Sequence, residues 1–273
     1  MIDKFVQVDG LKIRCLEEGQ GPEVLLLHGA ALGSSADVWE RNLDPLAGHG
    51  FRVIAFDQPG FGLSDCPRDY SVAYRRRFIL QLMDSLEINK AHLVGHSQAG
   101  GMAVSLAFDH PQRISKVIVL GTGSLLPPLS EGRKQAGPRE GQEGTASEPT
   151  LEDSRALLEH NLFNHSLITP DKLEKRHRMS VGKNFQAFLE RNNAAQRGSS
   201  KANVPLWQRL DQVPVPLLLI YGKEDRGSAA KRAALAKERY PHLNLHLVDH
   251  CKHLVQWDAA AEFERLAVQF LAS

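Results

Sequence analysis

Short apolar runs alternate with segments of helical periodicity along the first 121 residues. Runs of this length between polar turns are typical of strands that are covered on both faces. A hairpin pattern at 5–8 and 12–16, turning at Asp9-Gly10, comes before them. The expected strands are 24–28, 51–56, 91–95 and 116–121, and the expected helices are 36–49, 71–86 and 97–109. This βαβ order predicts an α/β fold with a mostly parallel, twisted sheet and helices on both faces.

The alternation stops near residue 125 and resumes near residue 213. A Gly/Pro-rich connection at 127–149 is followed by helical patterns at 151–162, 170–180, 184–195 and 205–210, two of which start at the capping residues Thr150 and Thr169. Strands at 215–221 and 243–248 and helices at 229–239 and 259–271 complete the chain. We therefore expect an α/β core of residues 1–124 and 213–273. Residues 125–212 would form a helical cap over the carboxyl edge of the sheet, where ligands bind in such folds.

Composition narrows the range of partners. The chain has 273 residues, 42% of them apolar, and a formal charge of +1. Such a balance does not favour nucleic acid or an anionic membrane as the partner. The chain shows no signal peptide and no apolar run of bilayer length, so we expect a cytoplasmic protein with a small-molecule partner. The histidines lack metal-ligand spacing such as HExxH, which predicts no metal.

A nucleophile motif lies between an expected strand and an expected helix. Residues 95–100 read Gly-His-Ser-Gln-Ala-Gly, and the sharp turn of a nucleophile elbow needs small residues on either side of its serine. Gly95 and Ala99 meet that need. Ser97 would stand at the amino end of the helix, where developing negative charge is favoured. This context predicts that Ser97 is a nucleophile.

A serine nucleophile needs a base, and the base needs an orienting acid. Asp225 and His253 follow the expected strands 215–221 and 243–248, in the order serine, acid, histidine that this fold uses. Glu224 and His250 are the neighbouring alternatives, and we expect both to be solvated loop residues. The chain thus offers Ser97, Asp225 and His253 as a catalytic triad.

The loop after the first buried strand is the candidate oxyanion-hole loop. It reads His-Gly-Ala-Ala at 28–31. The backbone N–H groups of Ala30 and Gln98 are the expected donors to an oxyanion. His28 is expected to be a structural residue that braces this loop.

Over nearly its full length the chain resembles the α/β-hydrolase superfamily. The elbow, the strand-end His28-Gly29 and the segment 57–64 (Asp-Gln-Pro-Gly-Phe-Gly-Leu-Ser) carry that likeness. More narrowly, it resembles the meta-cleavage product hydrolases, which break carbon–carbon bonds in the microbial degradation of aromatic compounds. Residues 251–257, the cap segment 167–176 and the run 205–207 carry the narrower resemblance.

The narrower resemblance implies a substrate of the 2-hydroxy-6-oxo-hexa-2,4-dienoate type. It implies that the substrate becomes a ketone, that Ser97 attacks the C6 carbonyl, and that the C5–C6 bond breaks before water releases the acyl group. No cofactor is implied. Arg176 would bind the dienolate-carboxylate end, and Trp207 would line the pocket. A homo-oligomer is also implied, since relatives are often dimers or larger.

The chain departs from that family at several positions. His96 stands where the family has asparagine, Leu254 replaces the tryptophan after the catalytic histidine, and Ala30-Ala31 occupies a normally glycine-rich loop. On residue pattern alone, Arg176 belongs to a basic helix typical of solvated arginines. Two alternatives therefore stay open: an ester or lactone hydrolase on the same triad, and a ligand receptor with little turnover.

Overall fold

The computed structural model describes residues 1–129, 147–197 and 204–273. Within them one sheet has the strand order β1-β2-β4-β3-β5-β6-β7-β8. The strands are β1 Ile2–Val8, β2 Leu11–Glu18, β3 Glu23–Leu27, β4 Arg52–Phe56, β5 Ala91–His96, β6 Ile114–Leu120, β7 Leu217–Gly222 and β8 Asn244–Val248. Strands β3 to β8 run parallel, and β2 pairs antiparallel with both β1 and β4. The mostly parallel sheet expected from the sequence is confirmed.

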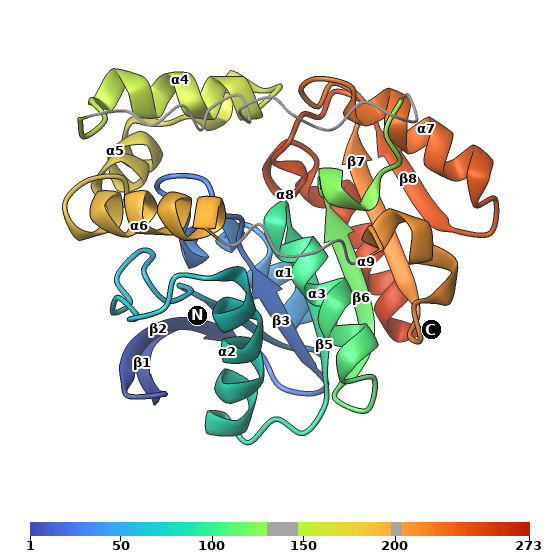
Figure 1. Cartoon of the computed structure of the whole chain (residues 1–273), viewed down its shortest axis with the longest axis horizontal. Coiled ribbons are helices and arrows are strands. Elements are labelled where there is room, and N and C mark those ends of the chain that lie inside the picture. The colour runs from blue at the N-terminus through green and yellow to red at the C-terminus, as the bar shows by residue number, and fades with distance from the viewer. Residues whose placement is uncertain (130–146, 198–203) are drawn as a thin grey trace.

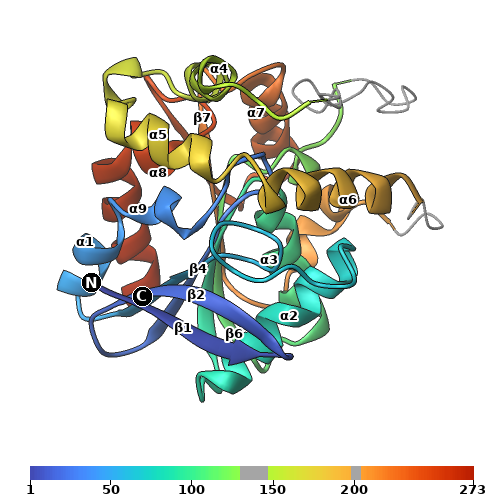
Figure 2. The same ribbon diagram turned by 90° about the vertical axis from the view of Figure 1, so that its left-hand side faces the viewer.

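Helices cover both faces of this sheet (Figures 1 and 2). Leu25 and Leu27 of β3 pack into one apolar cluster with α2, α3 and α7, whereas Val24 and Leu26 pack into the other with α1 and α9. This alternation follows from the two-residue period of a strand. The helices are α1 Leu43–Gly48, α2 Val72–Ser85, α3 Gln98–Asp109, α7 Ala229–Arg239, α8 Val255–Asp258 and α9 Ala260–Ala272.

Three further helices, α4 (Leu151–Asn161), α5 (Pro170–Arg178) and α6 (Lys183–Arg197), lie beyond the carboxyl ends of the central strands (Figure 1). The start of α4 is a reciprocal cap between Thr150 and Asp153, and Thr169 caps α5 with Pro170 in its first turn. Both starts agree with the sequence signals. Most of the expected connection 127–149 lies outside the described residues, because 130–146 are not described.

Two expected helices differ from the structure. The pattern at 36–49 is not one helix: it forms the 3₁₀ turn η1 (Ala36–Trp39) and then α1. Pro45 explains the break, because it has no N–H for an interior helical bond and is tolerated only in the first turn of α1. The pattern at 205–210 forms the 3₁₀ segment η4 (Leu206–Gln212), which is kinked at Arg209. Short 3₁₀ turns also lie at η2 (Gly123–Leu125) and η3 (His165–Leu167).

In the described ranges, no helix combines the length and the apolar character needed to cross a lipid bilayer.

Candidate active site

Ser97 lies at the tight turn from β5 into α3. Its backbone has φ 56° and ψ −125°, a strained conformation for a residue with a side chain. The turn is held by a hydrogen bond from the Ser97 N–H to the Leu120 carbonyl (2.8 Å). A methyl group on Gly95 would come within 2.6 Å of the Ala99 carbonyl oxygen, so only glycine fits there. The strain presents the Ser97 side chain at the carboxyl edge of the sheet.

His253 and Asp225 meet at the same edge from two different loops. Nδ1 of His253 lies 3.1 Å from Oδ2 of Asp225, and both residues are buried. Because a carboxylate accepts, Nδ1 carries the hydrogen and Nε2 keeps its lone pair. The Glu224 carboxylate accepts a hydrogen bond from the Cys251 N–H. His250 is exposed, and its ring contacts that of Phe163. The structure thus pairs His253 with Asp225, and neither neighbouring alternative takes its place.

A cavity of about 240 Å³ opens between the sheet edge and the cap helices. Ser97 and His253 both line it, as do Ala30 and Gln98. Within the described residues neither backbone N–H of Ala30 nor that of Gln98 has a hydrogen-bond partner, so both can donate to a ligand. The rest of the lining comes from both the core and the cap: Gly29, Ala31, Leu32, Ser34, Val38, His96, Pro149, Asp153, Leu157, Leu158, Asn161, Arg176, Phe188, Arg226 and Leu254.

His28 braces the loop that carries Ala30. Its Nδ1–H donates to the Gly29 carbonyl (2.7 Å), and its Nε2 accepts from the Gln58 N–H (3.0 Å). The Gln58 side chain donates in turn to the His28 carbonyl (2.6 Å). Burial lowers the pKa of His28 to about 3, so the ring stays neutral. The expected bracing role of His28 agrees with these contacts.

Arg75 of α2 joins that brace to the elbow. Its guanidinium donates twice to Oε1 of Gln58 and once to Oε1 of Gln98 (2.5 Å). It is 2% exposed and has no ion pair among the described residues. The sequence reading missed this link, although a signal exists: Arg75 shares the apolar face of α2 with Ile79, four residues on. One buried cation therefore connects the two sides of the candidate oxyanion hole.

Arg176 of α5 reaches the cavity from the cap. Its Nη2 donates to the Leu32 carbonyl (2.6 Å), while its buried Nε has no hydrogen-bond partner. No carboxylate of the described residues pairs with it, and burial lowers its pKa to about 10. Gly33 makes room for the guanidinium, because a methyl group there would lie 2.8 Å from Nε. A buried cation with a spare donor at a cavity wall is suited to an anionic ligand.

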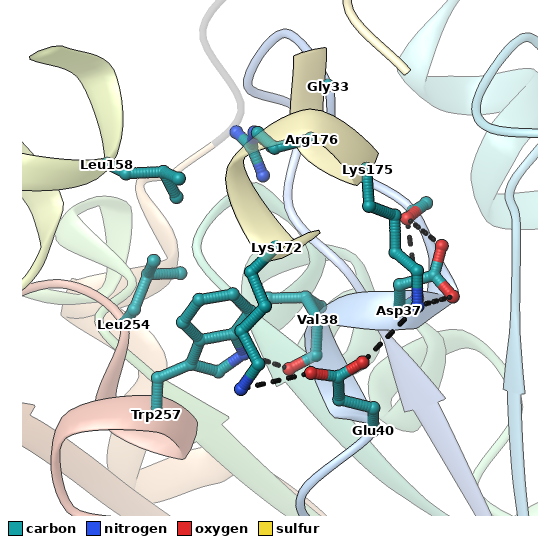
Figure 3. A pocket seen from close by; sticks show the side chains of 11 residues that line it. Gly33, Asp37, Val38, Glu40, Leu158, Lys172, Lys175, Arg176, Leu254 and Trp257 are labelled. Atoms are coloured by element: carbon teal, nitrogen blue, oxygen red, sulfur yellow. Dashed lines mark hydrogen bonds and ion pairs between the residues drawn. The ribbon is translucent and has the colours of Figure 1, made fainter. Parts of the chain in front are cut away.

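Two lysines on the same helix tie the cap to the core (Figure 3). Lys172 pairs with Glu40 (3.1 Å), and Lys175 pairs with Glu40 and Asp37 (3.4 and 3.6 Å). These contacts line a small side pocket that shares Arg176, Val38 and two leucines with the main cavity. The basic residues of α5 therefore have different roles: the lysines anchor the helix, and Arg176 faces the cavity.

The end of α4 is attached to the loop that carries His253. The Asn161 carbonyl accepts hydrogen bonds from the N–H groups of His253 and Leu254. The Asp258 carboxylate accepts from the N–H groups of Phe163 and Asn164 on the cap side and from Lys252 on the core side (2.9 to 3.0 Å). We call this set of contacts, made by Asn161 and Asp258, the cap clip. No local sequence signal pointed to it.

The structure does not bring Trp207 to the cavity, which corrects the expectation that it lines the pocket. Its half-buried ring lies under the Arg239 guanidinium, 4.8 Å from ring centroid to the charged carbon. The cause is the 3₁₀ turn of η4, in which the preceding Leu206 packs into the apolar core beside α3. Trp207 is therefore left on the side that faces α7.

The chain is similar to known proteins over nearly its whole length. The α/β hydrolase fold family matches residues 22–260. A 2-hydroxy-6-oxo-6-phenylhexa-2,4-dienoate hydrolase of Burkholderia cepacia is 32% identical, over 99% of this chain and 96% of its own. A 2-hydroxy-6-oxononadienedioate/2-hydroxy-6-oxononatrienedioate hydrolase of Burkholderia vietnamiensis is 30% identical, over 98% and 95%.

Among solved structures, a meta-cleavage product hydrolase from Pseudomonas fluorescens IP01 superimposes with a TM-score of 0.78 at 26% identity. That match covers 98% of this chain and 97% of the other. The narrower resemblance inferred from the sequence is confirmed by these full-length matches. The chain therefore belongs to the α/β-hydrolase fold family and, within it, to the meta-cleavage product hydrolases.

Proposed function

We propose that this hydrolase cleaves the C5–C6 bond of a 2-hydroxy-6-oxo-hexa-2,4-dienoate, with Ser97 as nucleophile. The observation that carries the proposal is Arg176, a cation without an acid partner on the wall of the cavity that Ser97 lines. Curated relatives with names of this activity align over nearly the whole chain. An enzyme for neutral esters alone would have no use for such a buried cation, which costs desolvation energy.

In the first half of the reaction, the proton of the C2 hydroxyl group moves to C5, which makes C2 a ketone and prepares an electron sink for the later bond cleavage. His253 takes the Ser97 proton, and Asp225 holds the imidazole in the tautomer that leaves Nε2 free. Ser97 then attacks the C6 carbonyl. The N–H groups of Ala30 and Gln98 receive the resulting oxyanion, and a single donor of this type is worth about 2.7–4 kcal/mol of transition-state stabilisation.

In the second half, the C5–C6 bond breaks and its electron pair moves into the dienolate. Arg176 stabilises this anion and its carboxylate by charge-assisted hydrogen bonds. The proton that His253 took from Ser97 passes to the dienolate oxygen, and the first product leaves as a 2-hydroxydienoate. Water, deprotonated by His253, then attacks the acyl group on Ser97 and frees the second product as a carboxylic acid. The proposal includes no cofactor and no metal.

A substrate panel tests the proposal. Wild-type protein should bleach the coloured dienoate, and Arg176→Ala should lower kcat/KM for it about 100-fold, as expected when a hydrogen-bonded charge pair is lost. For a neutral aryl ester, the same substitution should lower kcat/KM much less. Arg178→Ala, an exposed arginine two residues along α5, is the matched control. Wild-type protein that cleaves esters or lactones and leaves the dienoate coloured would establish the alternative activity instead.

We propose a cytoplasmic enzyme that acts on a small molecule and assembles as a homo-oligomer. A catalytically weak receptor remains the minor alternative, and measurable turnover of the dienoate excludes it. Sedimentation of the purified protein tests the assembly.

A further inference from the structure

His96 is a buried polar residue at the cavity to which the proposed reaction gives no role. It precedes Ser97 directly, is 5% exposed and lines the cavity. Its ring lies against that of His253, with 4.8 Å between centroids. A polar side chain in this position has to be matched to a partner, because burying an unmatched polar group is costly.

One nitrogen of His96 is accounted for. Nε2 lies 3.0 Å from the carbonyl oxygen of His253. Because a carbonyl only accepts, Nε2 carries the hydrogen, and Nδ1 keeps a lone pair. Burial holds the pKa of His96 well below its ordinary value, so the ring is neutral near pH 7. Nδ1 is therefore an acceptor and not a donor.

That acceptor stands open beside the nucleophile. No side chain or backbone group of the described residues donates to Nδ1. The space in front of it is kept free by Gly29: a methyl group there would lie 3.2 Å from both Nδ1 of His96 and the β-carbon of Ser97. Gly29 lines the cavity as well. A ligand that reaches Ser97 therefore passes the lone pair of His96.

The proposed substrate has one group suited to this acceptor. Its carboxylate is assigned to Arg176 and its C6 carbonyl to Ser97, and the hydroxyl at C2 lies on the stretch between these two ends. His96 and Arg176 both line this cavity. We propose that Nδ1 of His96 accepts a hydrogen bond from the 2-hydroxyl group of the dienol. This inference rests on the proposed function and assigns it one more substrate-binding residue.

Because Nδ1 of His96 is an acceptor, the contact distinguishes a hydroxyl group from a ketone at C2. An acceptor pairs with a hydroxyl group and faces the oxygen of a ketone unfavourably, so His96 selects the dienol on entry. A site built to pair with a hydroxyl discriminates strongly against an analogue without one. The 2-methoxy ether of the same dienoate, which cannot donate, should therefore bind much more weakly than the dienol.

Two substitutions distinguish the contributions of Nδ1 and Nε2 of His96. In His96→Gln the amide N–H can still reach the His253 carbonyl, but no acceptor remains at the Nδ1 position. In His96→Asn an acceptor remains there, and the contact with His253 is lost. Binding is measured optically in the Ser97→Ala background, where turnover does not interfere. We expect His96→Gln to weaken dienol binding about tenfold or more and to leave the weak binding of the methoxy ether nearly unchanged. We expect His96→Asn to retain most of the dienol affinity.

His92→Gln is the matched control, because His92 is a second buried histidine on β5, remote from the cavity lining. Equal loss of dienol affinity in the Gln and Asn variants, or no loss in either, would overturn the inference. If the Ser97→Ala protein bound neither compound and wild-type protein left the dienoate intact, the proposed function itself would fail. If the dienol and its ether bound equally well, only the role of His96 would fail.

Discussion

The carbonyl oxygen of Asn161, the last residue of α4, lies 3.1 Å from the backbone nitrogen of His253. The same oxygen accepts from Leu254, also at 3.1 Å. The proposed general base is thus supported on one side by Asp225 and on the other by the end of a cap helix. Any shift of α4 should move His253 relative to Ser97, so the cap is expected to affect the chemical step as well as substrate access.

Loosening the cap clip should therefore lower kcat. Asp258→Asn keeps one acceptor of the carboxylate and loses the charge that favours its three backbone donors. We expect kcat to fall about tenfold with a smaller change in KM, because a 1 Å misplacement of a catalytic group has a large effect on rate. Steady-state kinetics on the dienoate measure it. Glu262→Gln, which removes an exposed ion pair on α9, is the control and should leave kcat unchanged.

Arg75 should act on the rate through the oxyanion donors. Arg75→Met would leave Oε1 of Gln58 and Oε1 of Gln98 without their buried donor, at a cost of about 1–3 kcal/mol for each orphaned group. We predict a lower melting temperature and a kcat reduced more than 10-fold, with KM nearly constant. Arg77→Met, on the exposed face of the same helix, should change neither quantity. A variant with normal kcat would show that the two sides of the hole do not depend on this link.

Gly33 should be required for the position of Arg176. Its φ is +75°, and an added methyl group would overlap Oγ of Ser180 and press on Nε of Arg176. Gly33→Ala should raise KM for the dienoate, since the guanidinium has to move. Gly182→Ala has a similar positive φ and open space around it, so it carries the backbone strain without the displacement. Equal KM values in the two variants would contradict this role of Gly33.

The sequence was sufficient for the fold and for the positions of Ser97, Asp225 and His253 at one edge, because each follows a strand with a clear apolar pattern. Local patterns also located the caps at Thr150 and Thr169. They could not place Trp207, since the side that a short 3₁₀ turn presents depends on which neighbour packs into the core. Leu206 took that position in this chain.

Contacts between distant segments were beyond such patterns. Arg75 and Gln98 are 23 residues apart, and Asn161 and His253 are 92 apart. Nothing in either local sequence specifies the partner, because both contacts depend on how the cap and α2 pack on the finished sheet. The polar network around the candidate site could therefore be identified only from the folded structure. One signal did exist in the sequence, because Arg75 on the apolar face of α2 had to find a buried hydrogen-bond partner.

Acid should destabilise the fold through its buried histidines. Burial lowers the pKa of His28 to about 3 and holds that of His96 well below 6.5. The unfolded chain takes up these protons as the pH falls below about 6.5 and the folded chain does not, so the free energy of unfolding falls. Each histidine contributes up to about 1.4 kcal/mol per pH unit. Urea denaturation between about pH 7.5 and about pH 5 measures how steeply the free energy of unfolding depends on pH. In His28→Gln this dependence should be weaker by the contribution of one histidine.

The proposed reaction depends on the attack of Ser97 on the dienoate. Its most direct test is a single-turnover measurement of dienoate cleavage by wild-type protein and by Ser97→Ala, followed by the loss of the substrate's colour and by the products formed. We expect Ser97→Ala to bind the dienoate and to cleave it at least about 1,000-fold more slowly, as expected when a triad nucleophile is removed. Cleavage by Ser97→Ala within about tenfold of the wild-type rate would contradict it.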